Sequence, residues 1–291
     1  MDKRTVRIAD RQFVIGDQTL PMISGEFHFW RVQKSNWDVI IDTCKTMGIR
    51  ILSTYVAWKY HEIEPGTFDF TGRTAPERDL VGFMQKVNDA GLFLIMRPGP
   101  FIYAEWPAGG PPERVANLPR LSEDFLAESK VYIDAVCEVI APFQATRGGH
   151  VIMVQSDNEA WPNLCARFEE LGAAGGGGMF PDWLKQHYDN DLQRLNRKWR
   201  ASYKHFDEAA VFFEECYINR SLPLNGRLMP GERYTQRLID SQKFVEHYAT
   251  NIVAVNSRMY REAGIDVPMF ANGWHPYAQN LRDFMNVVDL A

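Results

Sequence analysis

Apolar residues along the chain recur with two different spacings, and the two spacings alternate. Segments in which apolar residues return every three or four positions, as on one face of a helix, lie at 37–47, 80–87, 125–143 and 244–259. Gly48 and Gly91 follow the first two segments, and glycine at such a position typically ends a helix. Between these segments lie short apolar runs at 49–56, 92–96, 151–155 and 267–271. The chain therefore predicts alternating helices and strands.

Two further strands are expected at the ends of this series, at 21–27 and from 287 onward. Strands that alternate with helices form a parallel sheet, and runs such as 92–96 are typical of strands buried on both faces. The alternation alone fits a closed barrel or an open doubly wound sheet. An open nucleotide-binding sheet would place a glycine-rich phosphate turn after the first strand, whereas Glu26, His28 and Trp30 stand there. We therefore expect an α/β fold, with the barrel favoured.

The segment 172–233 interrupts the alternation and is rich in aromatic residues. These aromatic residues include Trp183, Tyr188, Trp199, Tyr203, Phe206, Phe212 and Phe213. We interpret the segment as an insertion in one domain spanning 1–291. It could form a wall or lid over a site, or it could be a helical decoration on the outside of the domain.

Composition excludes several classes of protein. The net charge of -5 comes without a basic stripe, which argues against a nucleic-acid partner. The four cysteines are far apart and the histidines show no metal-ligand spacing, so we expect neither a metal nor a cofactor. No run approaches the ~18 apolar residues of a membrane span, and the N-terminus lacks an apolar signal segment, so we expect a cytoplasmic protein without a membrane partner. Nothing in the sequence sets an oligomeric state.

Four of the predicted strands end in a similar mixture of side chains. Carboxylates, amides and aromatic side chains occupy 24–30, 53–62, 97–106 and 155–161. The carboxyl ends of parallel barrel strands meet at one rim, where active sites form. Such side chains suit a sugar, because carboxylates and amides bind several hydroxyls and aromatic faces stack on the ring. Retaining cleavage of a glycosidic bond needs an acid and a nucleophilic carboxylate about 5–5.5 Å apart.

Each of these features has a simpler alternative when it stands alone. An Asn–Glu pair after a strand can cap a helix, Glu105 can be a buried partner of Arg97, and Trp58, Trp106 and Trp161 can be core residues. Their repetition at successive strand ends favours a common site.

The same strand ends resemble glycoside hydrolase family 35, the β-galactosidase family. The matching runs lie at 24–29, 53–58, 61–70, 97–102, 104–106 and 152–155, followed by Asn158 and Glu159. This resemblance implies a (β/α)8 TIM-type barrel. Since the chain holds about six of the eight strands, we expect an incomplete barrel.

The resemblance also implies roles for individual residues. Glu159 is expected to be the catalytic acid/base, and Asn158 to hold the 2-hydroxyl of the sugar. Tyr55, Ala104 and Glu105 are expected to bind the terminal sugar. Desolvation by Trp106 and Trp161 would raise the pKa of Glu159, as an acid catalyst requires.

The chain departs from the family pattern at Tyr103, where a smaller residue is usual, and we expect Tyr103 to shape the sugar pocket. Asp157 and Ala57 replace a usual Glu and a usual Pro. No residue matches the motif of the nucleophile, which we expect outside these 291 residues.

We therefore expect a retaining exo-glycosidase that releases a terminal β-linked galactose or a similar sugar. The alternatives are a non-catalytic carbohydrate-binding barrel, an inactive fragment, and an unrelated α/β interaction protein.

Overall fold

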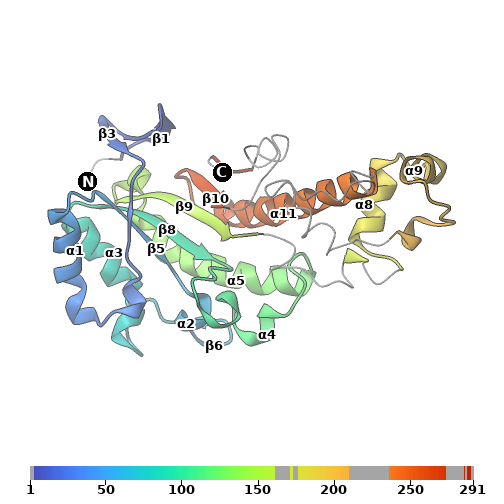
Figure 1. The fold of residues 1–291 in the computed structure, drawn as a ribbon. Coiled ribbons are helices and arrows are strands. Elements are labelled where there is room, and N and C mark those ends of the chain that lie inside the picture. The colour runs from blue at the N-terminus through green and yellow to red at the C-terminus, as the bar shows by residue number, and fades with distance from the viewer. Residues whose placement is uncertain are drawn as a thin grey trace. The chain divides into compact units, whose positions relative to one another are not determined.

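The computed structural model describes residues 3–160, 171–172, 176–209, 236–272, 285 and 287–289. The chain divides into two compact units, one formed by Met1–Ala160 with Ile252–Ala291 and the other by Trp161–Asn251. Figure 1 shows the elements of both units.

The first unit is built on a five-stranded sheet in which every neighbouring pair is parallel. In spatial order the strands are β10 (Met269–Asn272), β9 (Val151–Asn158), β8 (Phe93–Gly99), β5 (Ile51–Tyr55) and β4 (Gly25–Glu26). Apolar runs buried on both faces form these central strands, as the sequence predicts. Alternating strands and helices are thus confirmed as a parallel sheet.

Helices cover one face of this sheet. They are α1 (Trp37–Thr46), α3 (Leu80–Asp89), α5 (Glu123–Ile140) and the last turns of α11 (Gln236–Glu262). Their apolar faces form one core with Leu52, Leu94 and Val154 of the strands, and Figure 1 shows α1, α3 and α5 along one side of β5 and β8. Gly48 and Gly91 lie just beyond α1 and α3 at φ 84° and 74°, so the expected glycine helix ends are confirmed.

The connections carry shorter elements. They are α2 (Trp58–His61), the two-stranded sheet of β6 (Glu62–Glu64) and β7 (Thr67–Phe68), α4 (Glu113–Ala116), and the 3-10 helices η1 (Phe29–Arg31), η2 (Lys34–Asn36), η3 (Pro76–Arg78), η4 (Pro107–Gly109), η5 (Ala141–Phe143) and η6 (Ala145–Arg147).

A three-stranded antiparallel sheet that the sequence analysis did not predict precedes β4. It consists of β1 (Val6–Ala9), β2 (Gln12–Ile15) and β3 (Gln18–Pro21). Asp10 and Arg11 join β1 to β2 with φ of 50° and 60°, the two-residue turn that matches strand twist. This turn lacks the glycine that usually marks a hairpin, but the turn between β2 and β3 has one, Gly16 at φ 58°. Apolar residues of this sheet, including Phe13, pack with Ile95 and Met153 on the face of the parallel sheet that the helices leave free.

The second unit contains α8 (Met179–His187), α9 (Leu192–Trp199), η7 (Phe206–Glu208) and the first part of α11. Its elements meet at the fully buried Asp240, whose Oδ2 accepts hydrogen bonds from Tyr188 and, at 2.8 Å, from Trp199 Nε1. The aromatic residues of 172–209 therefore build a local core. Residues 210–233 of the predicted insertion lie outside the described residues, and its role as lid or decoration stays a prediction.

Both terminal strands of the predicted series differ from expectation. Of the segment 21–27, Pro21 ends β3 of the antiparallel sheet and only Gly25–Glu26 pairs in the parallel sheet. Residues 287–289 form a turn and bends rather than the start of a sixth strand. Asp289 still lies against β10: its backbone N–H donates to the Met269 carbonyl at 2.8 Å, and its Oδ2 accepts from the Met269 N–H at 2.7 Å and from Arg261 at 2.8 Å. The parallel sheet of the described residues thus has five strands rather than six.

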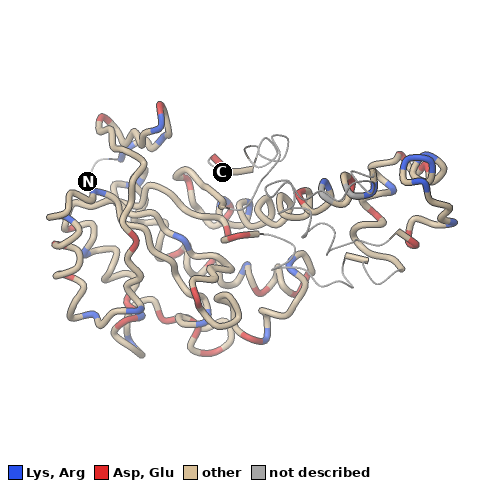
Figure 2. The backbone as a smooth tube through the Cα atoms, viewed as in Figure 1, with Lys and Arg blue, Asp and Glu red and all other residues tan. Residues whose placement is uncertain are grey.

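Across the ranges that the structure describes, no helix has both the length and the apolar character needed to cross a bilayer. Figure 2 shows Lys and Arg interspersed with Asp and Glu along the described chain. The expected absence of a nucleic-acid partner stays a prediction.

Candidate functional site

The carboxyl ends of the five parallel strands share one continuous hydrogen-bond network. Each strand contributes to it: Glu26 from β4, Tyr55 from β5, Arg97 from β8, Gln155 and Asn158 from β9, and Asn272 from β10. Parallel strands bring residues far apart in the sequence to one edge of the sheet. Tyr55 and Asn158, 103 positions apart, are thereby in contact.

Arg97 is the centre of this network. Its guanidinium donates to Glu26 Oε1 at 2.6 Å, to Asn158 Oδ1 at 3.3 Å, to the Tyr55 hydroxyl and to Gln155 Oε1. It also lies 3.8 Å from the centre of the Tyr55 ring, a cation–π contact. The expectation that Glu105 could pair with Arg97 is wrong, because Glu26 is the ion-pair partner.

The Asn158 side chain is held at both ends of its amide. Its Oδ1 accepts from Tyr55 at 3.0 Å, from Gln155 at 3.1 Å and from Arg97, and its Nδ2 donates to the Ile102 carbonyl at 3.0 Å. Arginine can only donate, so the atom facing it must be the amide oxygen. The amide nitrogen therefore retains one N–H that can bind a ligand.

Tyr55 is a neutral donor at ordinary pH. Burial raises its pKa to about 12, against the opposing charge of Arg97. The hydroxyl donates to Asn158 and accepts from Arg97, which fixes its direction.

Asp157, one residue before Asn158, points the opposite way into the core. Its Oδ2 pairs with the buried Arg120 and accepts from Asn256 at 3.0 Å, and its Oδ1 accepts from the Phe101 N–H at 3.2 Å. Burial raises the pKa of Asp157, while Arg120 and the backbone donors lower it. This residue anchors the end of β9 to the loop after β8.

That loop contains three consecutive residues in the left-handed region: Tyr103, Ala104 and Glu105 have φ of 49°, 44° and 52°. Each costs about 1–2 kcal/mol relative to right-handed backbone. The loop is closed by the Gly109 carbonyl, which accepts from the N–H groups of Ile102 at 2.8 Å and Tyr103 at 3.0 Å. Strained backbone of this kind gathers at functional sites, which agrees with a binding role for the loop.

Arg31 holds the outer side of this left-handed turn. Its guanidinium donates to the Ala104 carbonyl, lies 3.8 Å from Glu105 Oε2, and stacks 4.6 Å from the centre of the Trp30 ring. Glu105 is 90% exposed, so its carboxylate is free to meet a ligand from solvent. Tyr103 is half-buried against Phe101, with ring centres 5.7 Å apart.

Glu159 follows Asn158 with φ 50°, and its backbone N–H donates to Asn272 Oδ1 at 3.1 Å. Its side chain is exposed. The expected burial beside Trp106 is therefore not present in the described part of the chain, and Trp161 lies outside the described residues. The roles of Glu159, Asn158, Tyr55, Tyr103, Ala104 and Glu105 stay predictions.

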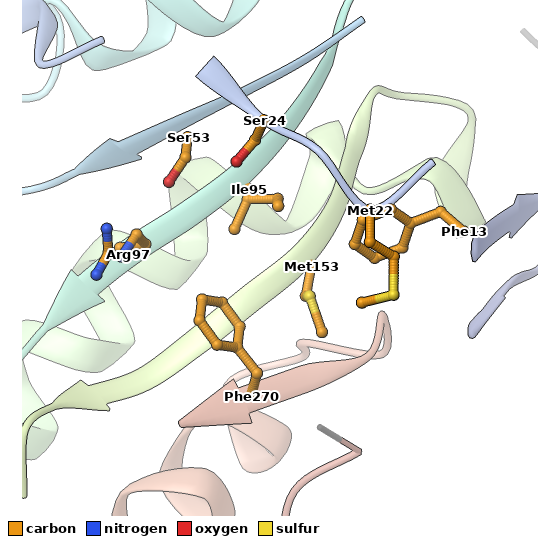
Figure 3. A pocket seen from close by; sticks show the side chains of 8 residues that line it. All are labelled: Phe13, Met22, Ser24, Ser53, Ile95, Arg97, Met153 and Phe270. Carbon is orange, nitrogen blue, oxygen red and sulfur yellow. The ribbon is translucent and has the colours of Figure 1, made fainter. Parts of the chain in front are cut away.

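A pocket of about 260 Å³ lies on the helix-free face of the sheet. Its lining is Phe13, Met22, Ser24, Ser53, Ile95, Arg97, Met153 and Phe270. Figure 3 shows Arg97 at one end and Met22 with Phe13 at the other. Of the hydrogen-bond network, Arg97 lines this pocket, where it lies with two serines and five apolar side chains.

Within the described ranges, no group of three or more His, Cys, Asp or Glu side chains is arranged to hold a metal ion.

Sequence reasoning missed one member of the network, Asn272. It directly follows the strand predicted at 267–271, so the rule that sites form at the carboxyl ends of strands could have found it. Glu26, Arg97 and Gln155 were noticed as strand-end residues, but the ion pair between Glu26 and Arg97 depends on side-chain directions that spacing does not fix.

Several known proteins are similar to this chain. An exo-β-D-glucosaminidase of Thermococcus kodakarensis is 31% identical over 234 residues, covering 71% of this chain and 29% of the relative. A β-galactosidase of Bos taurus is 34% identical over 176 residues, covering 58% of this chain and 26% of the relative. The chain therefore spans less than a third of these curated relatives.

Among solved structures, the β-galactosidase of the psychrophilic Marinomonas ef1 matches with a TM-score of 0.64 and 16% identity, covering 91% of this chain and 39% of that one. The sequence model of glycosyl hydrolases family 35 matches residues 12–169, which include every strand-end residue of the network except Asn272. Because that match extends over more than half of the 291 residues, the chain belongs to glycosyl hydrolases family 35.

Proposed function

We propose that this chain carries the sugar pocket and the acid/base of a retaining exo-glycoside hydrolase that releases a terminal β-linked galactose. The observation that carries the proposal is the Asn158–Glu159 pair at the carboxyl end of β9. The Asn158 amide is fixed by four hydrogen bonds, and Glu159 stands exposed beside it. A fixed hydrogen-bond donor next to an accessible carboxyl group suits acid-assisted cleavage of a glycoside.

The reaction would proceed in two displacements. In the first, Glu159 donates a proton to the glycosidic oxygen while a carboxylate nucleophile bonds to the anomeric carbon, and the bond from that carbon to the oxygen breaks. In the second, Glu159 takes a proton from water, whose oxygen displaces the carboxylate and releases the sugar. The nucleophile is proposed to lie outside residues 1–291, because no residue of this chain matches the family's nucleophile motif.

The polarity of the site favours a neutral sugar over an amino sugar. Three donors occupy Asn158 Oδ1, so the amide offers only an N–H to the substituent on carbon 2. A hydroxyl can accept from that N–H, whereas an ammonium group cannot, and the Arg97 cation bonded to the same Oδ1 would repel it. The proposed substrate therefore differs from the amino sugar in the name of the Thermococcus kodakarensis relative, an exo-β-D-glucosaminidase.

The fold of the whole protein is proposed to be a closed (β/α)8 barrel. The likeness to the Marinomonas structure supports it. So does the exposure of large apolar side chains near the edge strand β4 and on α1: Ile23 is 70% and Val39 67% exposed. Further β/α units would cover such residues.

A non-catalytic carbohydrate-binding role is the second candidate. The observation that favours it is the exposed Glu159 side chain, because catalytic sites of this kind are usually closed off from water.

Hydrolysis of p-nitrophenyl β-D-galactoside tests the proposal, measured with residues 1–291 and with any longer chain that includes them. Replacing Glu159→Gln should strongly slow the active form, and azide, a nucleophile that needs no general base, should restore release of p-nitrophenol with formation of the β-glycosyl azide. Binding of β-galactosides with no turnover by any form would favour the second candidate, and no binding of any β-glycoside would overturn both.

A further inference from the structure

Three side-chain amides are linked to one guanidinium at the strand ends. Gln155 Oε1 accepts from Arg97 Nε, and Gln155 Nε2 donates to Asn158 Oδ1 at 3.1 Å and to Asn272 Oδ1 at 2.6 Å. Asn272 Oδ1 also accepts from the Glu159 backbone N–H at 3.1 Å. The relay therefore runs from Arg97 through Gln155 to both of the asparagines that flank Glu159.

The chemistry of arginine sets the direction of every amide in this relay. An amide can be turned by 180° so that its oxygen and nitrogen exchange places, but a guanidinium has only donors. The oxygen of Gln155 must therefore face Arg97, and its NH2 group must face the asparagines. Both asparagines then present their oxygens to Gln155, so their NH2 groups point elsewhere.

The direction of each amide decides whether the site presents a hydrogen-bond donor or an acceptor to a ligand. Asn158 Nδ2 uses one hydrogen on the Ile102 carbonyl and keeps the other. No atom of the described residues accepts a hydrogen bond from Asn272 Nδ2, which lies beside the Glu159 backbone. Two amides thus supply donors next to the exposed carboxyl group.

We infer that Arg97 is a positioning residue that orients Asn158 directly and Asn272 through Gln155, and that Asn272 is a further donor for the ligand. Together they make the site selective for a hydrogen-bond acceptor at carbon 2 of the sugar. Glu26 supplies the counter-charge that holds Arg97 in place. The inference rests on the proposed function, since it assumes that a sugar binds beside Glu159.

The sharpest test is Gln155→Glu, which keeps the size of the side chain and its bond to Arg97 but replaces both donors by acceptors. All variants carry Glu159→Gln, so that no ligand is hydrolysed during titration. Dissociation constants are measured by calorimetry for methyl β-D-galactoside, its 2-deoxy analogue and its 2-amino-2-deoxy analogue.

With Gln155 intact, the galactoside should bind about tenfold more tightly than the 2-deoxy analogue, the ratio that one good hydrogen bond provides. Gln155→Glu should lower this ratio several-fold, because Asn272 loses the donor that sets its direction while Arg97 and Tyr55 still hold Asn158. The variant should also move the preference toward the 2-amino analogue. Asn272→Ala should weaken the galactoside several-fold. The matched control is Gln12→Glu, the same chemical change on an exposed strand position of β2, which should leave all three constants unchanged.

Arg97→Lys gives a second measurement if Gln155→Glu does not fold, as judged by circular dichroism. Lysine keeps the charge but cannot reach four acceptors in fixed directions, so it should also lose the preference for the 2-hydroxyl. An unchanged ratio of the galactoside to the 2-deoxy analogue in the folded variant overturns the inference and leaves the proposed function standing. Failure of the Glu159→Gln parent to bind any of the three glycosides overturns the proposed function, and the inference falls with it.

Discussion

Two arginine–carboxylate pairs flank the end of β9, and they differ in how far water reaches them. The side chains of Arg120 and Asp157 are 1% and 0% exposed, whereas those of Arg97 and Glu26 are 14% and 47% exposed. The first pair is enclosed by Phe101, whose ring centre lies 3.8 Å from the Arg120 guanidinium. In the second pair, Arg97 lines the pocket.

The difference separates a structural pair from one that can serve a ligand. Both oxygens of Asp157 are already bonded, to Arg120 and Asn256 on one side and to the backbone N–H groups of Phe101 and Asn158 on the other. A buried pair of this kind is costly to break because it leaves one charge without a partner. A pair open to water can lose a partner at lower cost, since solvent replaces it.

Breaking the buried pair should therefore have the largest effect on stability. Arg120→Met is expected to lower the free energy of unfolding by about 3–5 kcal/mol, because Asp157 stays buried without its counter-ion. Urea denaturation followed by circular dichroism measures the loss. Adding Asp157→Asn should recover part of it, and a loss under about 1 kcal/mol would show that the two pairs do not differ as described.

The stability of the same variant should depend on pH more steeply than that of the parent. Burial raises the pKa of Asp157 above its unfolded value, and the loss of Arg120 removes the main opposing charge. A carboxyl group with a raised folded pKa binds its proton more tightly in the folded state, so its contribution to stability grows as the pH falls and is lost as the pH rises. Arg120→Met, compared with the parent at each pH, should thus lose less stability at about pH 5 than at about pH 7. An equal loss at both values would contradict this assignment.

The open pair should give a smaller effect. Arg97→Met is expected to cost about 1–3 kcal/mol, the range for losing hydrogen bonds from a charged group, since Glu26 is left with access to water. The same urea titration measures it. A cost equal to that of Arg120→Met would remove the distinction between the two pairs.

An ion pair on the surface should have the smallest effect on the free energy of unfolding. Lys130 and Asp134 lie four residues apart on α5, 48% and 49% exposed. Lys130→Ala should change the free energy of unfolding by only about 0.3–0.5 kcal/mol, because an exposed pair on a helix contributes little and is screened by salt. A change above about 1 kcal/mol would mean that exposure does not rank these pairs.

Much of the sheet and part of the site could be predicted from the sequence. Helical spacing and the glycines at 48 and 91 located α1 and α3, because a helix with one apolar face and a left-handed end leaves a clear pattern. The contact between Tyr55 and Asn158 could also be expected, because each residue ends a predicted parallel strand and such strands end at the same edge of the sheet.

Other features depend on information that a single sequence does not display. The turn at Asp10 and Arg11 reaches positive φ without glycine, so the hairpin of β1 and β2 left no clear signal, whereas Gly16 at φ 58° in the turn between β2 and β3 could have indicated the second hairpin. Pairing of Glu26 with Arg97 follows from side-chain directions in three dimensions. Exposure of Glu159 depends on the backbone turning to φ 50° directly after β9.

The attachment of the N-terminal sheet has a consequence for synthesis on the ribosome. The Arg4 backbone N–H donates to the Ala145 carbonyl at 2.9 Å, and the apolar residues of β1 to β3 pack against Met153. Translation at roughly 5–20 residues per second needs about 7–30 s to travel from Arg4 to Met153. During that time Phe13, Ile15 and Leu20 lack part of the surface on which they pack, which includes Ala145, Ile152 and Met153. These three strands can therefore reach their native position only after residue 153 has been made, and until then their apolar residues are open to chaperones and to aggregation.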